Sequence, residues 1–267
     1  RDVRGIEVLM ELLAKVDQKY RNKPEGFRLQ NEVLRTLKAC FHSKVHVEEF
    51  ATDGSRLKKL ILSIDAGDET VRALTYELMG LIALFADEGP AHLSGAFEFL
   101  RYTRSMKHRF KPLIDALRLE SSLELIANGL VLVNAIINTP EELDERMALR
   151  LEMLGLGLDQ ALQELSQRHS EKGTASGVAK DILAQIETYQ GDVEHDQEEY
   201  SDRLAITAQG RRVNFRDPKE LFMGLMAHIK DKDHVYGGFY SVMKHLLDMP
   251  TDKARGVKLW WLVAKIV

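Results

Sequence analysis

The sequence contains little cysteine, little proline and no long apolar run, and each shortage excludes a class of protein. Cys40 is the only cysteine among 267 residues, which excludes an intramolecular disulfide framework. The longest apolar stretches, such as residues 78–86, have about half the length of a membrane-spanning helix. With one thiol and no apolar leader at the N-terminus, we expect a cytoplasmic protein without a membrane span.

Basic residues are not in excess either. Lys and Arg number 37 against 41 Asp and Glu, and the resulting net charge of −4 argues against a global nucleic-acid-binding protein. Hydrophobic residues make up 45% and charged residues 29%, which is the balance of a soluble globular protein. The chain is long enough to bury a substantial core.

The 6 prolines leave long stretches in which helices can form. Apolar residues recur three and four positions apart over residues 5–20 and 29–43, the period of a helix that buries one face. A turn around residues 23–26 joins these two stretches. No segment alternates with period two over any length, so a strand-rich fold is disfavoured.

A shorter helix followed by a longer, more apolar one recurs along the chain. The predicted pairs are 57–64 with 71–85, 112–117 with 123–137, and 218–229 with 239–249, with one further helix at 257–267. A spacing of roughly 40 to 50 residues is typical of armadillo or HEAT solenoids. The sequence therefore predicts an all-α fold, an armadillo-repeat right-handed superhelix (α-solenoid) of about four to five repeats. We interpret residues 1–267 as a single domain, interrupted by a polar and acidic segment at about 166–216.

Three helix starts carry a capping oxygen three residues before a glutamate, at Ser121, Thr139 and Asp217. In the last two, proline occupies the first helical position. We therefore predict helix boundaries at these three places.

Two segments carry charge of one sign. Residues 101–111 contain five Lys or Arg and no acid, whereas residues 187–202 contain seven Asp or Glu and no Lys or Arg. We interpret the basic run as a solvated face, with contact to an acidic protein partner, to phosphates or to an anionic membrane as open alternatives.

The sequence contains no pattern that predicts an enzyme, a cofactor or a metal site. Residues 173–177 have the wrong spacing for a phosphate-binding loop. His42 and His46 lie four positions apart, but no neighbouring Cys or Glu completes a zinc site. Residues 194–196, Glu-His-Asp, lie in a charged run that we expect to be solvated, and Cys40 is expected to pack in the core. Trp260 and Trp261 are expected to pack against neighbouring elements.

Residues 134–146, Asn-Ala-Ile-Ile-Asn-Thr-Pro-Glu-Glu-Leu-Asp-Glu-Arg, closely resemble the inhibitory armadillo region of diaphanous-related formins. The segment 150–158, which ends in a Leu-Gly-Leu turn, and residues 160–165 continue this similarity. Weaker similarity lies at residues 37–44, 110–114, 182–189 and 239–247. The resemblance covers about residues 5–267.

The resemblance implies a regulatory interaction domain. In this family the concave face of the solenoid binds an amphipathic helix from the C-terminal tail of the same protein and so inhibits actin assembly. A GTP-bound Rho-family GTPase relieves the inhibition, and actin is contacted only through the rest of the full-length protein. A location at the cytoskeleton or cell cortex follows from the same resemblance. The alternative is a generic armadillo scaffold that binds an unrelated peptide or protein.

The resemblance places the tail-binding groove on the helix at 123–137. Four apolar residues of this helix follow spacings of four, three and four, and such a stripe can serve the core or the groove but not both. A second apolar face, formed by Leu125, Leu132 and Ile136, is a surplus typical of a groove helix, although packing in the core alone stays open. The predicted groove residues are Ile126, Leu130, Val133, Asn134, Ile137, Glu77 and Lys244.

For two of these predicted groove residues the sequence says more. We expect the Asn134 amide to satisfy backbone groups between repeats. Glu77 stands where some family members carry Lys.

The resemblance also implies a GTPase contact at the end of the first repeat. Many animal members of the family carry a pair of Asn where this chain has His42 and Ser43, so the sequence does not specify which GTPase binds. The predicted contact residues are Arg35, Lys38, His42, Ser43 and Lys44.

Overall fold

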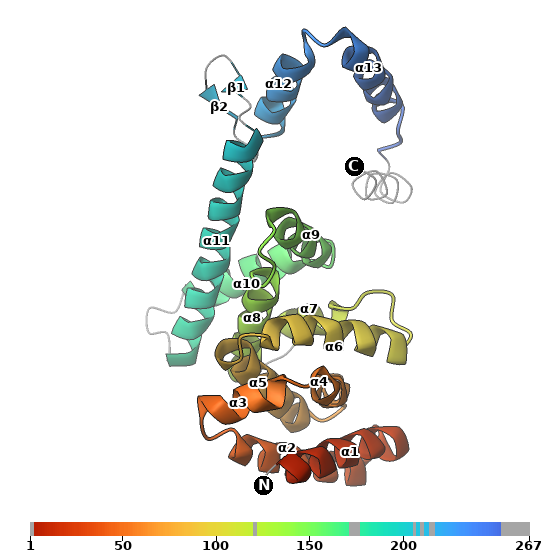
Figure 1. The fold of residues 1–267 in the computed structure, drawn as a ribbon, viewed down its shortest axis with the longest axis vertical. Coiled ribbons are helices and arrows are strands. Elements are labelled where there is room, and N and C mark those ends of the chain that lie inside the picture. Colours follow the sequence, from red (N-terminus) through yellow and green to blue (C-terminus); the bar gives the residue numbers. More distant parts are fainter. Residues whose placement is uncertain are drawn as a thin grey trace. The chain divides into compact units, whose positions relative to one another are not determined.

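The computed structural model describes residues 3–119, 122–170, 177–204, 207–208, 211–213 and 217–251. The chain divides into two compact units, residues 1–196 and 197–267. The first unit consists of helices that follow one another along the chain (Figure 1). That all 267 residues form a single domain stays a prediction.

The helices of the first unit range from 3 residues in η1 to 28 in α11, and α11 continues into the second unit. They are α1 (Val3–Tyr20), α2 (Pro24–Cys40), α3 (Lys44–Ala51), α4 (Gly54–Leu60), η1 (Ile61–Ser63), α5 (Glu69–Phe85), α6 (Gly89–Thr103), α7 (Lys111–Leu119), α8 (Leu123–Ile137), α9 (Leu143–Leu154), α10 (Leu158–Ser170) and α11 (Gly177–Leu204).

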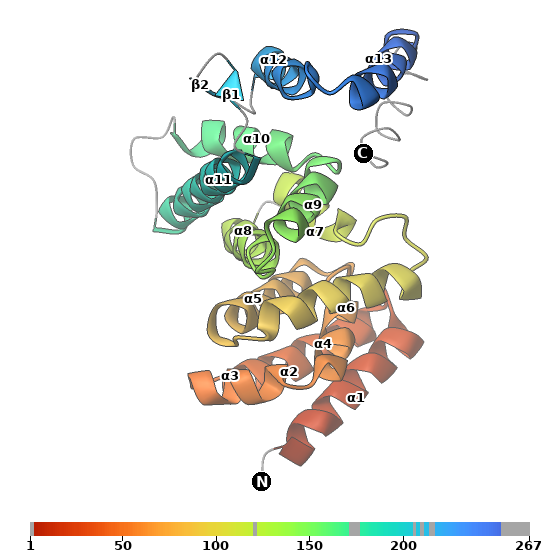
Figure 2. The ribbon, with the colours of Figure 1, turned by 45° about the horizontal axis from the view of Figure 1, so that its top comes forward.

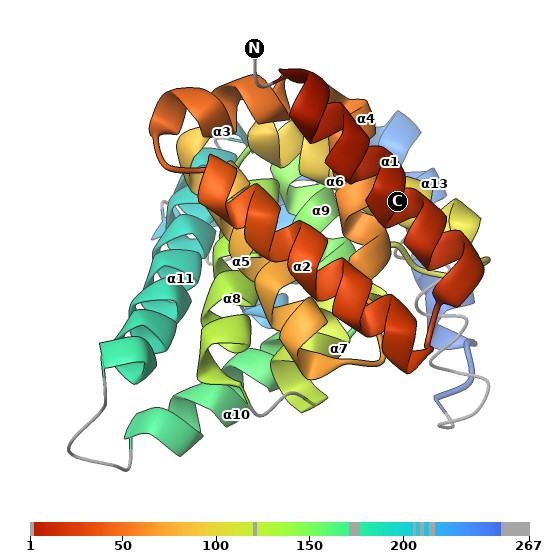
Figure 3. The same ribbon diagram turned by 90° about the horizontal axis from the view of Figure 1, so that it is seen from below.

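The helices of the first unit stack in two layers. The long helices α2, α5 and α8 pack in that order as one layer (Figure 3). In the other layer, α1 packs against α4 and α4 against α6 (Figure 2). We therefore assign α1–α2, α3–α5, α6–α8 and α9–α11 to successive repeats. The predicted all-α, armadillo-like fold is confirmed.

A continuous apolar core runs through these repeats. The largest fully buried side chains come from the first three repeats: Met10, Phe50, Tyr76, Phe97 and Phe110. Burying one large apolar side chain stabilises a fold by about 1.5–3 kcal/mol, so this core is the main source of stability. The Tyr76 hydroxyl donates to the Pro112 carbonyl at 3.2 Å.

Helix starts were predicted with mixed success. Asp217 caps α12 as expected, because its carboxylate accepts from the Lys219 amide at 2.9 Å. At α8 the cap is Ser122, whose hydroxyl accepts from the Leu125 amide, one residue after the expected Ser121. The expected cap at Thr139 is wrong, since its hydroxyl donates to the Ala135 carbonyl at 2.6 Å and α9 begins at Leu143.

The α2 and α6 helices differ from the predictions for physical reasons. Pro24 was assigned to a turn, but it is the first residue of α2. Proline is tolerated at this position because a backbone N–H there would have no partner within the helix. The α6 helix was not predicted, because Gly89-Pro90 and Gly95 lower its helix propensity. Burial of Leu93, Phe97 and Leu100 on one face outweighs that cost.

The second unit contains a small hairpin and two helices. Strands β1 (Thr207–Ala208) and β2 (Arg211–Arg212) pair antiparallel, with Thr207 opposite Arg212 and Ala208 opposite Arg211. Helices α12 (Pro218–Ile229) and α13 (Asp233–Leu247) pack together, with the Phe222 and Phe239 rings 6.5 Å apart.

The helix predicted at 218–229 is confirmed. The helix predicted at 239–249 begins six residues earlier, at Asp233. The predictions for residues 257–267 and for Trp260 and Trp261 lie outside the described residues. No helix in the described part of the chain is both long and apolar enough to cross a membrane.

Candidate interaction surface on the long helices

Both apolar faces of α8 are buried. Each of the four stripe residues is 1% exposed, and the second face is 0–1% exposed: Ile126, Leu130, Val133 and Ile137, then Leu125, Leu132 and Ile136. The α8 helix packs against α5, α6, α7 and α9, so several neighbours use its surplus of apolar faces. The expectation that the stripe lines an exposed groove is therefore wrong, and these side chains belong to the core.

The open side of α8 carries smaller residues. Ala127, Val131 and Ala135 are half-buried at positions four apart, between the exposed Glu124 and Asn138. Residues four apart share one face of a helix, so the three side chains form a shallow apolar strip. The sequence analysis missed this strip, although the four-residue spacing of small apolar residues between two bulkier stripes is visible in the sequence.

The α5 helix, which packs against α8, carries a similar half-buried strip. Leu74, Glu77 and Leu81 are half-buried on one side of α5. A β-carbon added at Gly80 would lie 2.8 Å from Asn128 Oδ1, so the glycine allows α5 and α8 to approach closely. We call Leu74, Glu77, Leu81, Ala127, Val131 and Ala135 the long-helix face.

One ion pair joins the two predicted sites. Lys38 Nζ of α2 lies 2.6 Å from Glu77 Oε1 of α5, and the two side chains are 47% and 35% exposed. Lys38 was predicted to contact a GTPase and Glu77 to line the groove. The structure brings these two residues together, and a pair this exposed contributes about 1 kcal/mol or less to stability.

The remaining predicted GTPase contacts share one exposed edge at the end of α2 and the start of α3. Arg35, His42, Ser43 and Lys44 are all exposed. The His42 and His46 rings stack 4.1 Å apart, and the Ser43 hydroxyl lies 2.5 Å from His46 Nδ1. This edge therefore presents four exposed polar side chains, and binding of a GTPase to it stays a prediction.

Asn134 has the structural role that we predicted. Its amide nitrogen donates at 2.9 Å to both the backbone and the side-chain oxygen of Gln185 in α11. Asn138, one turn later in the chain, donates to Asp192, which also belongs to α11. These bonds join α11 to α8 at the edge of the long-helix face.

Lys244 belongs to the second unit, where it is exposed on α13. A role for Lys244 in tail binding stays a prediction.

The acidic run forms part of α11 and is only partly solvated. Asp196 is 4% exposed, and its two oxygens each lie 2.8 Å from an arginine of α9, Oδ1 from Arg146 and Oδ2 from Arg150. Burial raises the pKa of Asp196, but the hydrogen bonds and charges of the two arginines outweigh burial and hold that pKa below its ordinary value. The expectation of a fully solvated run is wrong here, because α9 supplies two buried cations.

Tyr189 extends this buried cluster. Its ring lies 5.9 Å from the Arg150 guanidinium, and burial raises the pKa of Tyr189 to about 12. On the other side of the helix, Glu187 and Glu194 are exposed. The α11 helix therefore presents carboxylates to solvent while it is fastened to α9 by a buried one.

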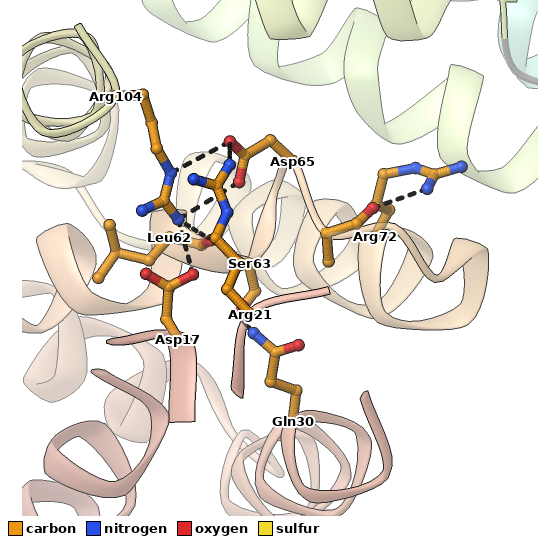
Figure 4. Close-up of polar contacts among 9 residues, drawn as sticks. Asp17, Arg21, Gln30, Leu62, Ser63, Asp65, Arg72 and Arg104 are labelled. Carbon is orange, nitrogen blue, oxygen red and sulfur yellow. Dashed lines mark hydrogen bonds and ion pairs between the residues drawn. The ribbon is translucent and has the colours of Figure 1, made fainter. Parts of the chain in front are cut away.

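Most cations of the basic run form ion pairs with acids of the same chain. Arg104 Nη2 donates to Asp17 at 2.6 Å and to the Leu62 carbonyl at 3.0 Å, and its Nε donates to Asp65 at 3.2 Å (Figure 4). Arg21 adds a 2.6 Å ion pair to Asp65. Burial lowers the pKa of Arg104. The hydrogen bonds and charges of Asp17 and Asp65 raise it by a larger amount, so the pKa of Arg104 is raised overall.

Three more cations of this run have partners. Arg101 pairs with Glu98 at 2.6 Å, Arg109 with Glu152 at 2.7 Å and Lys111 with Asp115 at 2.7 Å. The interpretation of the run as a solvated face is therefore wrong for Arg104, whose side chain is 10% exposed. The run is too neutralised to act as a basic patch.

Other candidate chemical groups have ordinary surroundings. Cys40 is half-buried, less than expected for a core thiol. Among the described residues no three His, Cys, Asp or Glu side chains gather to hold a metal ion.

Comparisons with known proteins agree with the helical stack. The Diaphanous FH3 Domain model matches residues 92–267, about two thirds of the chain. The chain belongs to the Diaphanous FH3 Domain family. The resemblance to diaphanous-related formins is thereby confirmed.

Relatives of this FH3 chain cover almost all of it. Formin-F of Dictyostelium discoideum is 28% identical over 269 residues, covering 100% of this chain and 21% of the relative. Human protein diaphanous homolog 2 is 24% identical over 249 residues, covering 93% of this chain and 21% of the relative. The FH3 chain thus spans about a fifth of the length of these relatives.

A solved structure shares the fold. The crystal structure of E. histolytica Formin1 bound to EhRho1-GTPgammaS superposes with a TM-score of 0.64 at 16% sequence identity. The match covers 76% of the FH3 chain and 68% of that protein. It supports the armadillo-like fold assigned above.

Proposed function

We propose that this FH3 chain is a non-catalytic regulatory domain of a formin. Its long-helix face binds an amphipathic helix from the C-terminal tail of the same protein, and this contact inhibits actin assembly. A GTP-bound Rho-family GTPase at the exposed edge of α2 and α3 relieves the inhibition. The rest of the formin contacts actin, and we expect the protein at the cytoskeleton or cell cortex.

The observation that carries this proposal is the long-helix face. An amphipathic helix binds by placing apolar side chains three and four residues apart into a complementary apolar strip. Leu74 and Leu81 on α5, with Ala127, Val131 and Ala135 on α8, provide such a strip. Small side chains on α8 let the backbone of a bound helix approach closely.

Exposed carboxylates on α11 support a ligand with a basic end. Glu187 and Glu194 are exposed on this helix and would attract basic residues that flank a tail helix. On α2, Lys38 is paired with Glu77. We therefore expect a basic end of a bound helix to be attracted towards α11.

Support for the GTPase comes from the family and from the exposed edge. The E. histolytica neighbour is a formin bound to EhRho1-GTPgammaS, which shows the partner class of that protein. In the FH3 chain, Arg35, His42, Ser43 and Lys44 are exposed where α2 passes into α3. These are the residues that we propose as the GTPase contact.

The test is calorimetric titration with a tail-type peptide, an amphipathic helix of Met-Asp-x-Leu-Leu character followed by basic residues. We expect saturable binding at or below the micromolar range. Val131→Asp should abolish it with unchanged helical circular dichroism, because Val131 is half-buried on the open side of α8. Val8→Asp on α1, where the valine is 66% exposed, is the matched control and should bind normally.

Two outcomes separate this proposal from its alternative. Competition between the peptide and a GTP-loaded Rho-family protein, weakened by Arg35→Glu, would support the regulatory domain. Failure of the wild-type chain to bind any tail-type peptide would contradict it and would favour a generic armadillo scaffold with an unrelated ligand.

A further inference from the structure

The layer formed by α1, α4 and α6 is interrupted after α6. The α1 helix packs on α4, and α4 packs on α6, but α9 packs mainly against α8 and α10. A groove of about 500 Å³ occupies the position between α6 and α9. We call it the α6–α9 groove, and its open walls are Ala91 and Ser94 of α6, Thr139 and Pro140, and Ala148 and Leu149 of α9.

The lining of this groove is apolar and sterically open. Ala91 and Ala148, on opposite walls, are both exposed, and each presents only a methyl group. The floor is formed in part by Ile136, which is 1% exposed and packed in the core. Apolar concavities of about 300–1,000 Å³ are the usual size of small-ligand and side-chain pockets.

One end of the groove is closed by an ion pair. Arg109 donates to Glu152 through Nε at 3.1 Å and through Nη2 at 2.7 Å, a two-pronged contact. The cation is therefore neutralised by a carboxylate from the same groove. The Arg109–Glu152 pair therefore has little net positive charge that could attract an acidic ligand.

The other end is strongly acidic. Glu145 lines the groove, and Glu141, Glu142 and Asp144 precede it on the chain. All four are exposed, and none forms an ion pair with another residue of the described chain. An apolar groove lined by the exposed carboxylate of Glu145, with three more exposed acids just before it on the chain, is complementary to an apolar, positively charged ligand.

The length of the groove limits the size of this ligand. Glu145 and Glu152 lie seven residues apart on α9, a rise of about 10 Å along the helix. That distance corresponds to about three residues of extended chain. A short linear segment fits it better than a long helix does.

We propose that the α6–α9 groove binds a short linear peptide of another polypeptide, with large apolar side chains next to a lysine or arginine. The apolar side chains enter between Ala91 and Ala148, and the basic residue pairs with Glu145. The groove uses α6 and α9 and none of the residues of the long-helix face. The inference therefore does not depend on the proposed tail binding.

The experiment is selection of a phage-displayed random heptapeptide library on the intact FH3 chain. We expect enrichment of sequences that place Leu, Ile, Phe or Trp beside Lys or Arg. One synthesised consensus peptide is then titrated by fluorescence anisotropy. Its affinity should fall at least tenfold for Ala148→Trp, which fills the groove, and severalfold for Glu145→Arg.

Controls make the result specific to this groove. Leu151→Trp, at a 54% exposed position of α9 that does not line the groove, should leave the affinity unchanged. Circular dichroism of each variant checks the fold, and Ala91→Trp repeats the blocking test from the α6 wall.

The proposal is overturned by any of three results. These are no enrichment, an acidic consensus, or consensus peptides that bind Ala148→Trp and Ala91→Trp as tightly as the wild-type chain. Loss of binding in Val131→Asp but not in Ala148→Trp would assign the selected peptides to the long-helix face and would also overturn it.

Discussion

The basic run at 101–111 and the acidic run at 187–202 look like counterparts of opposite charge in the sequence, but they have different roles in the structure. Four of the five cations in the basic run form ion pairs with acids of the same chain. In the acidic run, Asp196 is buried between two arginines, while Glu187, Glu194 and Glu198 are exposed. The basic run therefore mostly stabilises the fold, whereas the acidic run also leaves negative charge exposed to solvent.

The difference teaches that a charge run shows its function only when its tertiary partners are known. The acids that neutralise Arg104 and Arg109 come from α1, from the segment after η1 and from α9, up to 87 residues away in the chain. A sequence window shows the local partners of Arg101 and Lys111 but none of these distant ones. Four predictions test the contrast between structural and exposed charges, from the largest expected effect to the smallest.

Replacement of Arg104 should have the largest effect. Arg104→Ala leaves Asp17, whose side chain is 7% exposed, without a counter-charge, and we expect a loss of about 3 to 5 kcal/mol in the free energy of unfolding. Urea denaturation followed by circular dichroism measures this loss. Lys107→Ala, in the same run but exposed, should change the value by less than about 0.5 kcal/mol. Equal effects would show that burial does not distinguish the two cations.

Replacement of Asp196 should show a pH signature. Because the pKa of Asp196 is lower in the folded protein than its ordinary value of 3.8, its carboxylate stabilises the fold above about pH 4. That stabilisation is lost as the pH falls through the folded-state pKa. Asp196→Asn should cost about 3 kcal/mol at pH 7, and the difference from wild type should shrink towards pH 2. A difference that stays constant from pH 7 to pH 2 would rule out the charge as the cause.

The Arg109–Glu152 pair should contribute less. The two side chains are 24% and 33% exposed, so we expect a coupling of about 1 kcal/mol or less between Arg109→Ala and Glu152→Ala in a double-mutant cycle. Additive effects would mean that the two-pronged contact adds no stability.

Removing an exposed charge should leave stability almost unchanged. Glu187→Gln is expected to alter the free energy of unfolding by less than about 0.5 kcal/mol but to slow association with a basic tail-type peptide at low salt. Stopped-flow association at two ionic strengths measures the effect, with Glu49→Gln on the exposed side of α3 as the matched control. A rate that is independent of ionic strength would exclude electrostatic attraction by α11.

Local patterns in the sequence predicted much of the fold. Periodicity located α1, α5 and α8, because each of these helices buries apolar residues at helical spacing. Within the segment expected to interrupt the repeats, Ile182, Ile186 and Tyr189 are buried on one side of α11. The α6 helix was missed because packing outweighs its weak propensity.

The candidate site was harder to predict than the fold. Every large apolar residue of α8 looked suitable for a groove, but the number of neighbouring helices decides which face stays open. The open face carries Ala127, Val131 and Ala135, which a search for bulky stripes passes over. The partners of Asp196 were invisible for a related reason, since Arg146 and Arg150 lie about fifty residues earlier in the chain.

The Arg104 cluster has a consequence for how the chain unfolds. In an ideal repeat protein each repeat contacts only its neighbours, so stability is a sum of local terms and the ends can fray independently. Arg104 ends α6 in the third repeat, yet it binds Asp17 in the first repeat as well as Asp65 in the second. The first repeat therefore cannot detach without breaking a bond to the third, so this one side chain couples repeats that are not neighbours in the chain.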